Sequence, residues 1–333
     1  MSAVVLHIPH SSKLIPGDLR RQILLSDDEL ELEICRMTDA YTDELFESES
    51  SFSVTFPVSR LVVDPERFLD DASEPMAARG MGVVYSRTSQ GEPLRAPLDA
   101  EVRRALIARF YTPHHAALER RVDETLARQA ECIVVDCHSF PDVRLRYEDE
   151  SDAARPDLCI GTDGYHTPDE LVELLADEAD MRGWSVLVNE PFSGSIVPEK
   201  HYRKKASVMS VMLEVNRKLY MDETSGAKGE RFEETRETLQ YLLSVIDGWR
   251  HETQFERIRE QGDMLAEQYW DSGGPGAGAG YVTAFDYHGV FLVVGDAGLR
   301  ICPSREEAIR DATAETDATV SVDVCDEDES FDV

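Results

Sequence analysis

The sequence predicts an α/β fold, because short apolar segments of strand length alternate with longer segments of helical pattern. Three apolar segments each lead to a chemically competent side chain: 4–8 to His10, 133–136 to His138, and 208–213 to Glu214. Ligands bind at strand ends in α/β sheets, and two histidines with a carboxylate can hold a divalent metal and activate its water. The pattern therefore favours a metal-dependent hydrolase.

In the first part of the chain, helices are predicted on both sides of a loop-rich segment. Ser26 with Glu29 forms a capping-box pattern, and the helix that it opens is expected to run to about Phe46. On that helix Asp39 and Asp43 are four residues apart and would share one face. A second helical pattern runs from Asp99 to Gln129 and feeds the 133–136 strand, with a kink or break expected at Pro113.

The later part of the chain continues the alternation and then changes character at a run of glycines. Further strands are expected at 158–160 and 184–189, separated by a helix, and a long helix at 230–269 follows the third key strand. Residues 271–280 are rich in glycine and predict a linker. The expected organisation is a catalytic domain over 1–270 and a small ββαβ module with an acidic tail over 281–333. The module's expected elements are strands at 281–285, 290–294 and 319–324 and a helix at 305–314.

The charge balance excludes one class of partner and indicates an environment. Lys and Arg number 34 against 66 Asp and Glu, which gives a net charge of -32, and only six of the cations are lysines. Nucleic acid is therefore not an expected partner. Repulsion among so many carboxylates destabilises the folded state until salt screens it, so we expect a salt-adapted protein. Its melting temperature should rise between low and molar salt, and a flat or falling value would contradict this.

Targeting and redox features point to the cytoplasm. The N-terminus lacks the pattern of a signal peptide, and no segment has the roughly eighteen apolar residues that span a bilayer. We expect neither membrane association nor disulfides. The six cysteines have no Cys-x-x-Cys spacing and are interpreted as reduced thiols, mostly structural.

The metal ligands predicted from the residues are His10, His138 and one carboxylate. Each histidine follows a strand, although a histidine hydrogen-bonded to backbone would occupy the same position. The carboxylate expected three residues after His10 is replaced by Lys13, so the third ligand must come from elsewhere. Asp39 is our choice and Asp43 the second candidate. His7 lies inside its strand and is expected to be buried structure.

Glu214 is the predicted general base, which would take a proton from the activated water and pass it to the leaving nitrogen. Its alternative is a structural ion pair with Arg217, whose own alternative is to bind a substrate carboxylate. Arg60 and Arg67 are further carboxylate-binding candidates. Arg203 lies in the basic segment 200–205, which either suits a small anionic substrate or is a solvated loop.

Together these residues resemble the N-formylglutamate amidohydrolase family. The matching stretches, in the same order, are Pro9–Ser11, Arg60–Phe68, Asp136–Ser139, Asn189–Gly194 and Leu213–Glu223. The resemblance implies a mixed, largely parallel sheet flanked by helices, similar to zinc carboxypeptidases, and hydrolysis of N-formyl-L-glutamate to formate and glutamate. It also adds Asn189 to the candidate substrate-binding residues. The acidic stretch at 148–152 and the C-terminal module are not explained by the family.

Several alternatives remain open at this point. Zn²⁺ is the expected cofactor, but histidine and carboxylate ligands accept other divalent metals. A carboxypeptidase or another N-acyl amino-acid hydrolase would use the same site with a different acyl pocket. A non-catalytic binding protein with a remnant site would bind no metal stoichiometrically. The sequence gives no oligomeric state.

Overall fold

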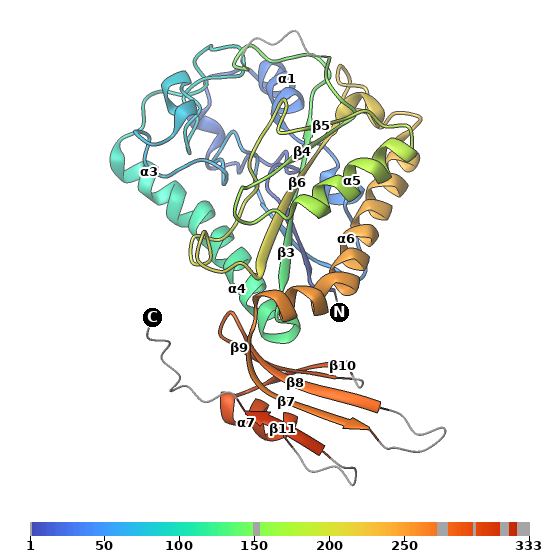
Figure 1. Cartoon of the computed structure of the whole chain (residues 1–333). Helices are drawn as coiled ribbons and strands as arrows, with labels where there is room; N and C mark the ends of the chain where they lie inside the picture. Colours follow the sequence, from blue (N-terminus) through green and yellow to red (C-terminus); the bar gives the residue numbers. More distant parts are fainter. Residues whose placement is uncertain (1, 149–153, 272–278, 296–297, 314–319, 325–333) are drawn as a thin grey trace. The chain divides into compact units, whose positions relative to one another are not determined.

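The computed structural model describes residues 2–148, 154–271, 279–295, 298–313 and 320–324 (Figure 1). The predicted acidic tail and most of the acidic stretch at 148–152 lie outside this range. The chain forms two units, Met1–Glu124 with Cys132–Asp247 and Thr125–Glu131 with Gly248–Val333. Two helices, at 112–129 and 232–261, each contribute residues to both units.

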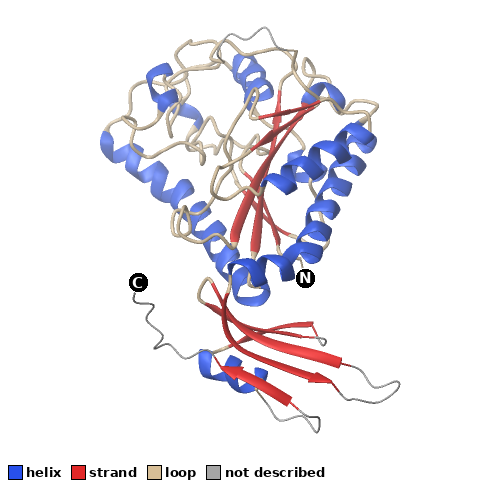
Figure 2. Ribbon diagram, in the orientation of Figure 1, coloured by secondary structure: helices blue, strands red, loops and turns tan. Residues whose placement is uncertain are grey.

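The first unit is built on a six-stranded sheet with the order β2-β1-β3-β6-β4-β5. All neighbouring strands are parallel except β4 and β6, which are antiparallel. Helices flank the sheet (Figure 2), so the predicted mixed, largely parallel α/β fold is confirmed. The strands are β1 (Val4–Ile8), β2 (Phe52–Thr55), β3 (Cys132–Phe140), β4 (Leu158–Gly161), β5 (Val186–Val188) and β6 (Val208–Asn216).

Strands β1, β3 and β6 are buried along their whole length. Such strands favour continuous apolar sequence, which is why their histidine and acidic members His7, Asp136, His138 and Glu214 are conspicuous. A buried polar group costs free energy unless it is hydrogen-bonded or paired. These four residues are therefore the part of the sheet that packing alone does not explain.

The helices of the first unit follow the sequence with one informative exception. Their bounds are α1 (Asp27–Met37), α2 (Thr42–Leu45), α3 (Ala100–Leu106), α4 (Thr112–Gln129), α5 (Asp169–Met181) and α6 (Phe232–Gln261). The capping box at Ser26 and Glu29 is formed. However, α1 ends at Met37 and not near Phe46, because Thr38 is extended and Tyr41 adopts a left-handed conformation with φ 69°. Asp39 therefore lies in a loop and does not share a helix face with Asp43.

The break expected at Pro113 takes the form of a π-helical turn at Ile107–Tyr111, between α3 and α4. Proline has no N–H to donate to the preceding turn, so the hydrogen-bond pattern must change ahead of it. The chain nevertheless stays helical from Ala100 to Gln129.

Besides the ends of α4 and α6, the second unit contains a five-stranded antiparallel sheet with the order β10-β9-β8-β7-β11 and the helix α7 (Arg305–Ala312). The strands are β7 (Asp263–Asp271), β8 (Ala279–Tyr287), β9 (Val290–Gly295), β10 (Gly298–Cys302) and β11 (Val320–Val324). The helix expected to reach residue 269 ends at Gln261, and the residues after it form β7. The small module thus starts before the glycine-rich segment and has two strands more than the ββαβ pattern predicted from the sequence.

Two observations bear on the remaining expectations. Within the described ranges, no helix combines the length and apolar character required to span a bilayer. Cys35, Cys132, Cys137, Cys159 and Cys302 are free thiols, in line with the expectation, and Cys325 lies outside the described residues.

Candidate active site

Parallel strands place the key side chains on one face of the sheet. His7 in β1 is opposite Asp136 in β3, and His138 in β3 is opposite Glu214 in β6. Because alternate residues of a strand point to the same face, Asp136 and His138 share that face with their partners. His10 lies two residues beyond the end of β1. The structure therefore brings His10, His138 and Glu214 to the same edge, as the sequence predicted.

His10 has one nitrogen bound and one free. Its Nε2 lies 2.9 Å from Asp64 Oδ1. Its Nδ1 is buried and has no hydrogen-bond partner among the described residues. That nitrogen faces two carboxylates, with Asp39 Oδ2 at 3.6 Å and Glu66 Oε2 at 3.8 Å. A buried ring nitrogen that is free but directed at carboxylates is suited to metal ligation, and Asp64 is placed to fix the ring's orientation.

His138 is surrounded by carboxylates. Its Nδ1 lies 3.1 Å from Asp39 Oδ2, and its Nε2 lies 3.1 Å from Asp136 Oδ1 and 3.2 Å from Glu66. Burial lowers the pKa of His138, but the negative charges of Glu66 and Asp136 outweigh burial and hold it well above its usual value. A site that stabilises protons on buried histidines in this way favours positive charge, which a divalent metal would supply in place of the protons.

Two carboxylates compete for the position of third ligand. Asp39 Oδ2 lies between the Nδ1 atoms of His10 and His138, and its backbone N–H donates to His10 O at 3.0 Å. Glu66 forms with the two histidines a group whose ligand atoms all lie within 4.8 Å of one another. Asp43, the second candidate from the sequence, is exposed and is not part of this cluster, because the break after α1 separates it from Asp39.

Glu214 is buried, and its Oε2 has no hydrogen-bond partner in the described part of the chain. Burial raises the pKa of Glu214 to about 7, with His138 lowering it and Asp39 and Glu66 raising it further. A carboxyl group with a pKa near neutrality can both accept and return a proton at physiological pH, which is what a general base of hydrolysis needs.

Arg217 is committed to structure. Its Nη2 donates to Asp39 Oδ1 at 2.9 Å, its Nη1 to Arg36 O at 2.7 Å, and its Nε to Ser139 Oγ at 3.2 Å. No ion pair with Glu214 is formed within the described residues, so Glu214 is left for chemistry. Arg217 instead fixes the carboxylate of Asp39, and these contacts favour the structural role of Arg217 over binding of a substrate carboxylate.

The other predicted substrate-binding residues fall into two groups. Arg60 and Arg67 lie beside the cluster: Arg60 Nη2 donates to Asp64 Oδ2 at 2.8 Å, and Arg67 Nε is buried without a hydrogen-bond partner among the described residues. Asn189 and Arg203 are exposed. Asn189 bonds with Thr162 across the ends of β4 and β5, and the Arg203 guanidinium lies over the Tyr202 ring. In the described part of the chain, neither of them contacts a residue of the cluster.

The basic segment 200–205 is also paired locally. Lys200 Nζ and His201 Nε2 lie 2.5 and 2.8 Å from the two oxygens of Asp123, which belongs to α4. The contacts therefore favour a solvated loop that offsets nearby acidic groups over a binding site for an anionic substrate.

Comparison with known proteins identifies the family. The model of the N-formylglutamate amidohydrolase family matches residues 2–221, which is more than half of the chain and includes every residue of the cluster. The chain belongs to the N-formylglutamate amidohydrolase family. It is accordingly a hydrolase of the amidohydrolase type, and the resemblance drawn from its motifs is confirmed. The family model ends before α6 and does not include the part of the second unit from Gly248 onward.

One solved structure agrees with the fold of this chain. The N-formylglutamate amidohydrolase from Ralstonia eutropha JMP134 superposes with a TM-score of 0.64 at 24% identity, covering 75% of this chain and 95% of that one. A gene product from Agrobacterium tumefaciens gives a TM-score of 0.49 at 21% identity, with coverage of 74% and 92%. No match was found among curated proteins.

Three carboxylates of this amidohydrolase site were not singled out from the sequence. Asp64 and Asp136 contact the Nε2 atoms of His10 and His138, and Glu66 lies between the two rings. All three occur within the family stretches. Their closeness in sequence to the candidate histidines and arginines was the signal that could have identified them as site residues. Asp136 also accepts from His7 Nδ1 at 2.7 Å, and His7 Nε2 lies 2.8 Å from His114 Nε2. His7 is buried, and with Glu66 and Asp136 it forms a second group of side chains that could hold a metal.

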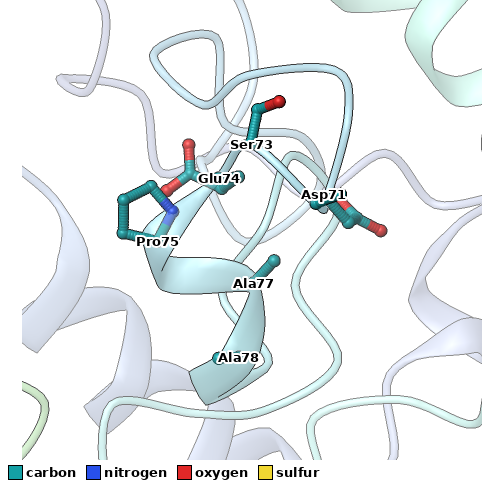
Figure 3. Close-up of a pocket in the computed structure, with 7 residues that line it drawn as sticks. Asp71, Ser73, Glu74, Pro75, Ala77 and Ala78 are labelled. Carbon is teal, nitrogen blue, oxygen red and sulfur yellow. The ribbon is translucent and has the colours of Figure 1, made fainter.

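A surface pocket of about 500 Å³ lies elsewhere (Figure 3). It is lined by residues of the 71–78 segment, including Asp71, Ser73 and Glu74. None of its lining residues belongs to the cluster around His10 and His138, and we therefore assign the chemistry to the sheet edge.

Proposed function

We propose that this amidohydrolase cleaves the N-formyl amide of N-formyl-L-glutamate, or of a closely related N-acyl amino acid, in a reaction that requires a divalent metal. His10, His138 and Asp39 would hold the metal. The observation that carries the proposal is the convergence of two histidine Nδ1 atoms on Asp39 Oδ2, with buried carboxylates on the opposite ring nitrogens. Nitrogen and oxygen ligands of this kind are typical of zinc sites.

When bound, the metal would polarise the amide carbonyl and make a water molecule easier to deprotonate. The remaining steps fall to side chains of this chain. Glu214 takes the proton of the attacking water on its unpartnered oxygen and delivers it to the departing nitrogen, so that glutamate leaves as the amine. Arg67 offers a buried N–H to a substrate carboxylate beside the cluster.

Metal analysis combined with formate release tests the proposal. Protein purified in high salt should contain about one divalent metal per chain, as one set of ligands implies. It should release formate from N-formyl-L-glutamate, and chelation should abolish release until metal is restored. Undiminished release from metal-free protein would contradict metal dependence, whereas bound metal without release would contradict the substrate. The bound ion identifies zinc or another metal directly.

The size of the acyl group is tested by a separate comparison. A formyl group needs almost no space beyond the reacting carbon, so N-formyl-glutamate should be turned over faster than N-acetyl- or peptidyl-glutamate. A faster rate on either larger substrate would reassign the enzyme to another class of N-acyl amino-acid hydrolase or to a carboxypeptidase.

A further inference from the structure

Arg155 lies at the same edge of the sheet as the catalytic cluster. It precedes β4, which is antiparallel to β6, so the start of β4 adjoins the end of β6: Leu158 is opposite Val215, and Asn216 N donates to Asp157 O at 2.9 Å. Arg155 therefore lies on the β4 side of the same sheet edge that carries His138 and Glu214.

Aromatic rings hold the Arg155 guanidinium in place. Its Cζ lies 5.0 Å from the centre of the Phe140 ring and 5.7 Å from that of Phe192. Phe140 follows His138 by two residues in β3 and so points to the same face of the sheet. Phe192 is anchored through its carbonyl, which accepts from Cys159 Sγ at 3.2 Å. Arg155 is thus stacked on the catalytic face, with 7% of its side chain exposed.

The hydrogen bonds of Arg155 leave one edge of the guanidinium open. Nη1 donates to Glu148 Oε2 at 2.6 Å. Nε and Nη2 are buried and have no hydrogen-bond partner among the described residues. These two nitrogens direct parallel N–H bonds to the same side, at the spacing of the two oxygens of a carboxylate. Leaving such donors buried and unpaired costs free energy, so the edge favours an acceptor.

Other arginines of this chain show what that edge binds. Arg257 uses its Nε and Nη2 on Glu131, with distances of 2.9 Å to Oε1 and 2.8 Å to Oε2. Arg60 uses the same pair of nitrogens on Asp64. In Arg155 the equivalent edge is directed toward no protein carboxylate in the described residues, although its Nη1 is paired.

We propose that Arg155 binds one carboxylate of the substrate and thereby selects N-acyl amino acids with two acidic groups. The inference rests on the proposed function. In the strand order, β3 and β6 with His138 and Glu214 lie between β1 and β4. Strand β1 leads to His10, whose partner Asp64 lies beside Arg67, and Arg155 precedes β4. On the Arg155 side two buried guanidinium nitrogens have no hydrogen-bond partner among the described residues, and on the other side Arg67 Nε also makes no hydrogen bond and lies 3.7 Å from Asp64 Oδ2. Two arginines on opposite sides of the reacting amide match a substrate with an α- and a γ-carboxylate.

The test compares Arg155→Met with the unmodified protein on N-formylglutamate and on its two mono-amides, in which either the α- or the γ-carboxylate is neutral. Methionine keeps the apolar contact with Phe140 but removes the donors. We expect kcat/KM on N-formylglutamate to fall about 10- to 100-fold, mainly through KM, as for loss of a charge-assisted pair. On the mono-amide that lacks the carboxylate bound by Arg155, the substitution should lower kcat/KM only slightly. The mono-amide that shows this result identifies which carboxylate Arg155 binds.

Equal losses of kcat/KM on all three substrates would show a purely structural role and overturn the proposal. An unchanged KM on N-formylglutamate would also overturn it, because the open edge of Arg155 would then hold only water. Arg182→Met is the matched control, because Arg182 also stacks on an aromatic ring, Tyr241, but is exposed on the surface. Arg155→Lys, which keeps the charge without the paired donors, should recover only part of the activity.

Binding of L-glutamate, measured by calorimetry, separates this inference from the proposed function. If the unmodified protein releases no formate but binds L-glutamate in a manner that Arg155→Met weakens, the reaction is wrong and the role of Arg155 stands. If formate is released and L-glutamate binding is unaffected by the substitution, the role of Arg155 is wrong and the reaction stands. Circular dichroism melting of each variant shows whether it is folded.

Discussion

Replacing Glu214 with Gln should lower the turnover of N-formylglutamate by about 10²- to 10⁴-fold, the range that general acid–base catalysis contributes. The substitution preserves the shape of the side chain but removes the group that accepts and returns the proton. Because Glu214 lies beside the proposed ligands and is not one of them, the metal content should stay the same. Formate release and metal analysis on the same preparation would measure both.

The control for this experiment is Glu234→Gln on the exposed surface of α6, where Arg231 is the side chain's ion-pair partner among the described residues. It removes one carboxylate from an acidic protein without touching the cluster. Near-normal turnover in Glu214→Gln would refute the assigned role, and loss of the metal together with activity would move Glu214 into the ligand set.

Asp39→Asn should weaken metal binding by more than about 100-fold, whereas Glu66→Gln should cost about 10- to 100-fold, the usual effect of a residue that only supports the ligands. The difference is expected because Asp39 Oδ2 faces both Nδ1 atoms, while Glu66 is nearest to His138 Nε2, which Asp136 also contacts. Equilibrium competition with a chelator of known affinity would rank the two variants.

The reverse order would assign the third ligand to Glu66 and leave Asp39 as the residue that orients His138. Asp39→Asn also weakens the partner of Arg217, so urea unfolding of both variants must accompany the metal measurement. A loss of metal affinity in a variant that remains fully folded reports on ligation and not on stability.

The parts of the site that could be predicted were those fixed by short-range pattern. Continuous apolar segments identified β1, β3 and β6, and parallel strands bring their ends to one edge, so His10, His138 and Glu214 could be expected to meet. The chemistry of its side chain makes Asp39 a candidate ligand, although the helix predicted from the sequence extends beyond the observed end of α1. The left-handed Tyr41 that ends the helical path has no clear signature in a residue that is not glycine.

The parts that could not be predicted depend on tertiary contacts or on ambiguous charge. Asp64, Glu66 and Asp136 are three among 66 acidic residues, and only the folded chain shows which of them face the histidines. Asn189 and Arg203 lie in loops, where no periodicity fixes the direction of a side chain. The residues of β7 directly follow a 30-residue helix, and a continuing polar pattern hid the change to a strand.

The glycine-rich segment has a consequence for engineering. It joins β7 to β8, which are neighbours in one antiparallel sheet and whose ends pair at Asp271 and Ala279. It is therefore the connection of a hairpin, and its length does not determine the distance between separate domains. A chain that ended at the glycines would lack β8 and β11, the two strands that pair with β7 in the sheet. An epitope tag or fluorescent reporter inserted at the glycines would leave the strand pairing intact.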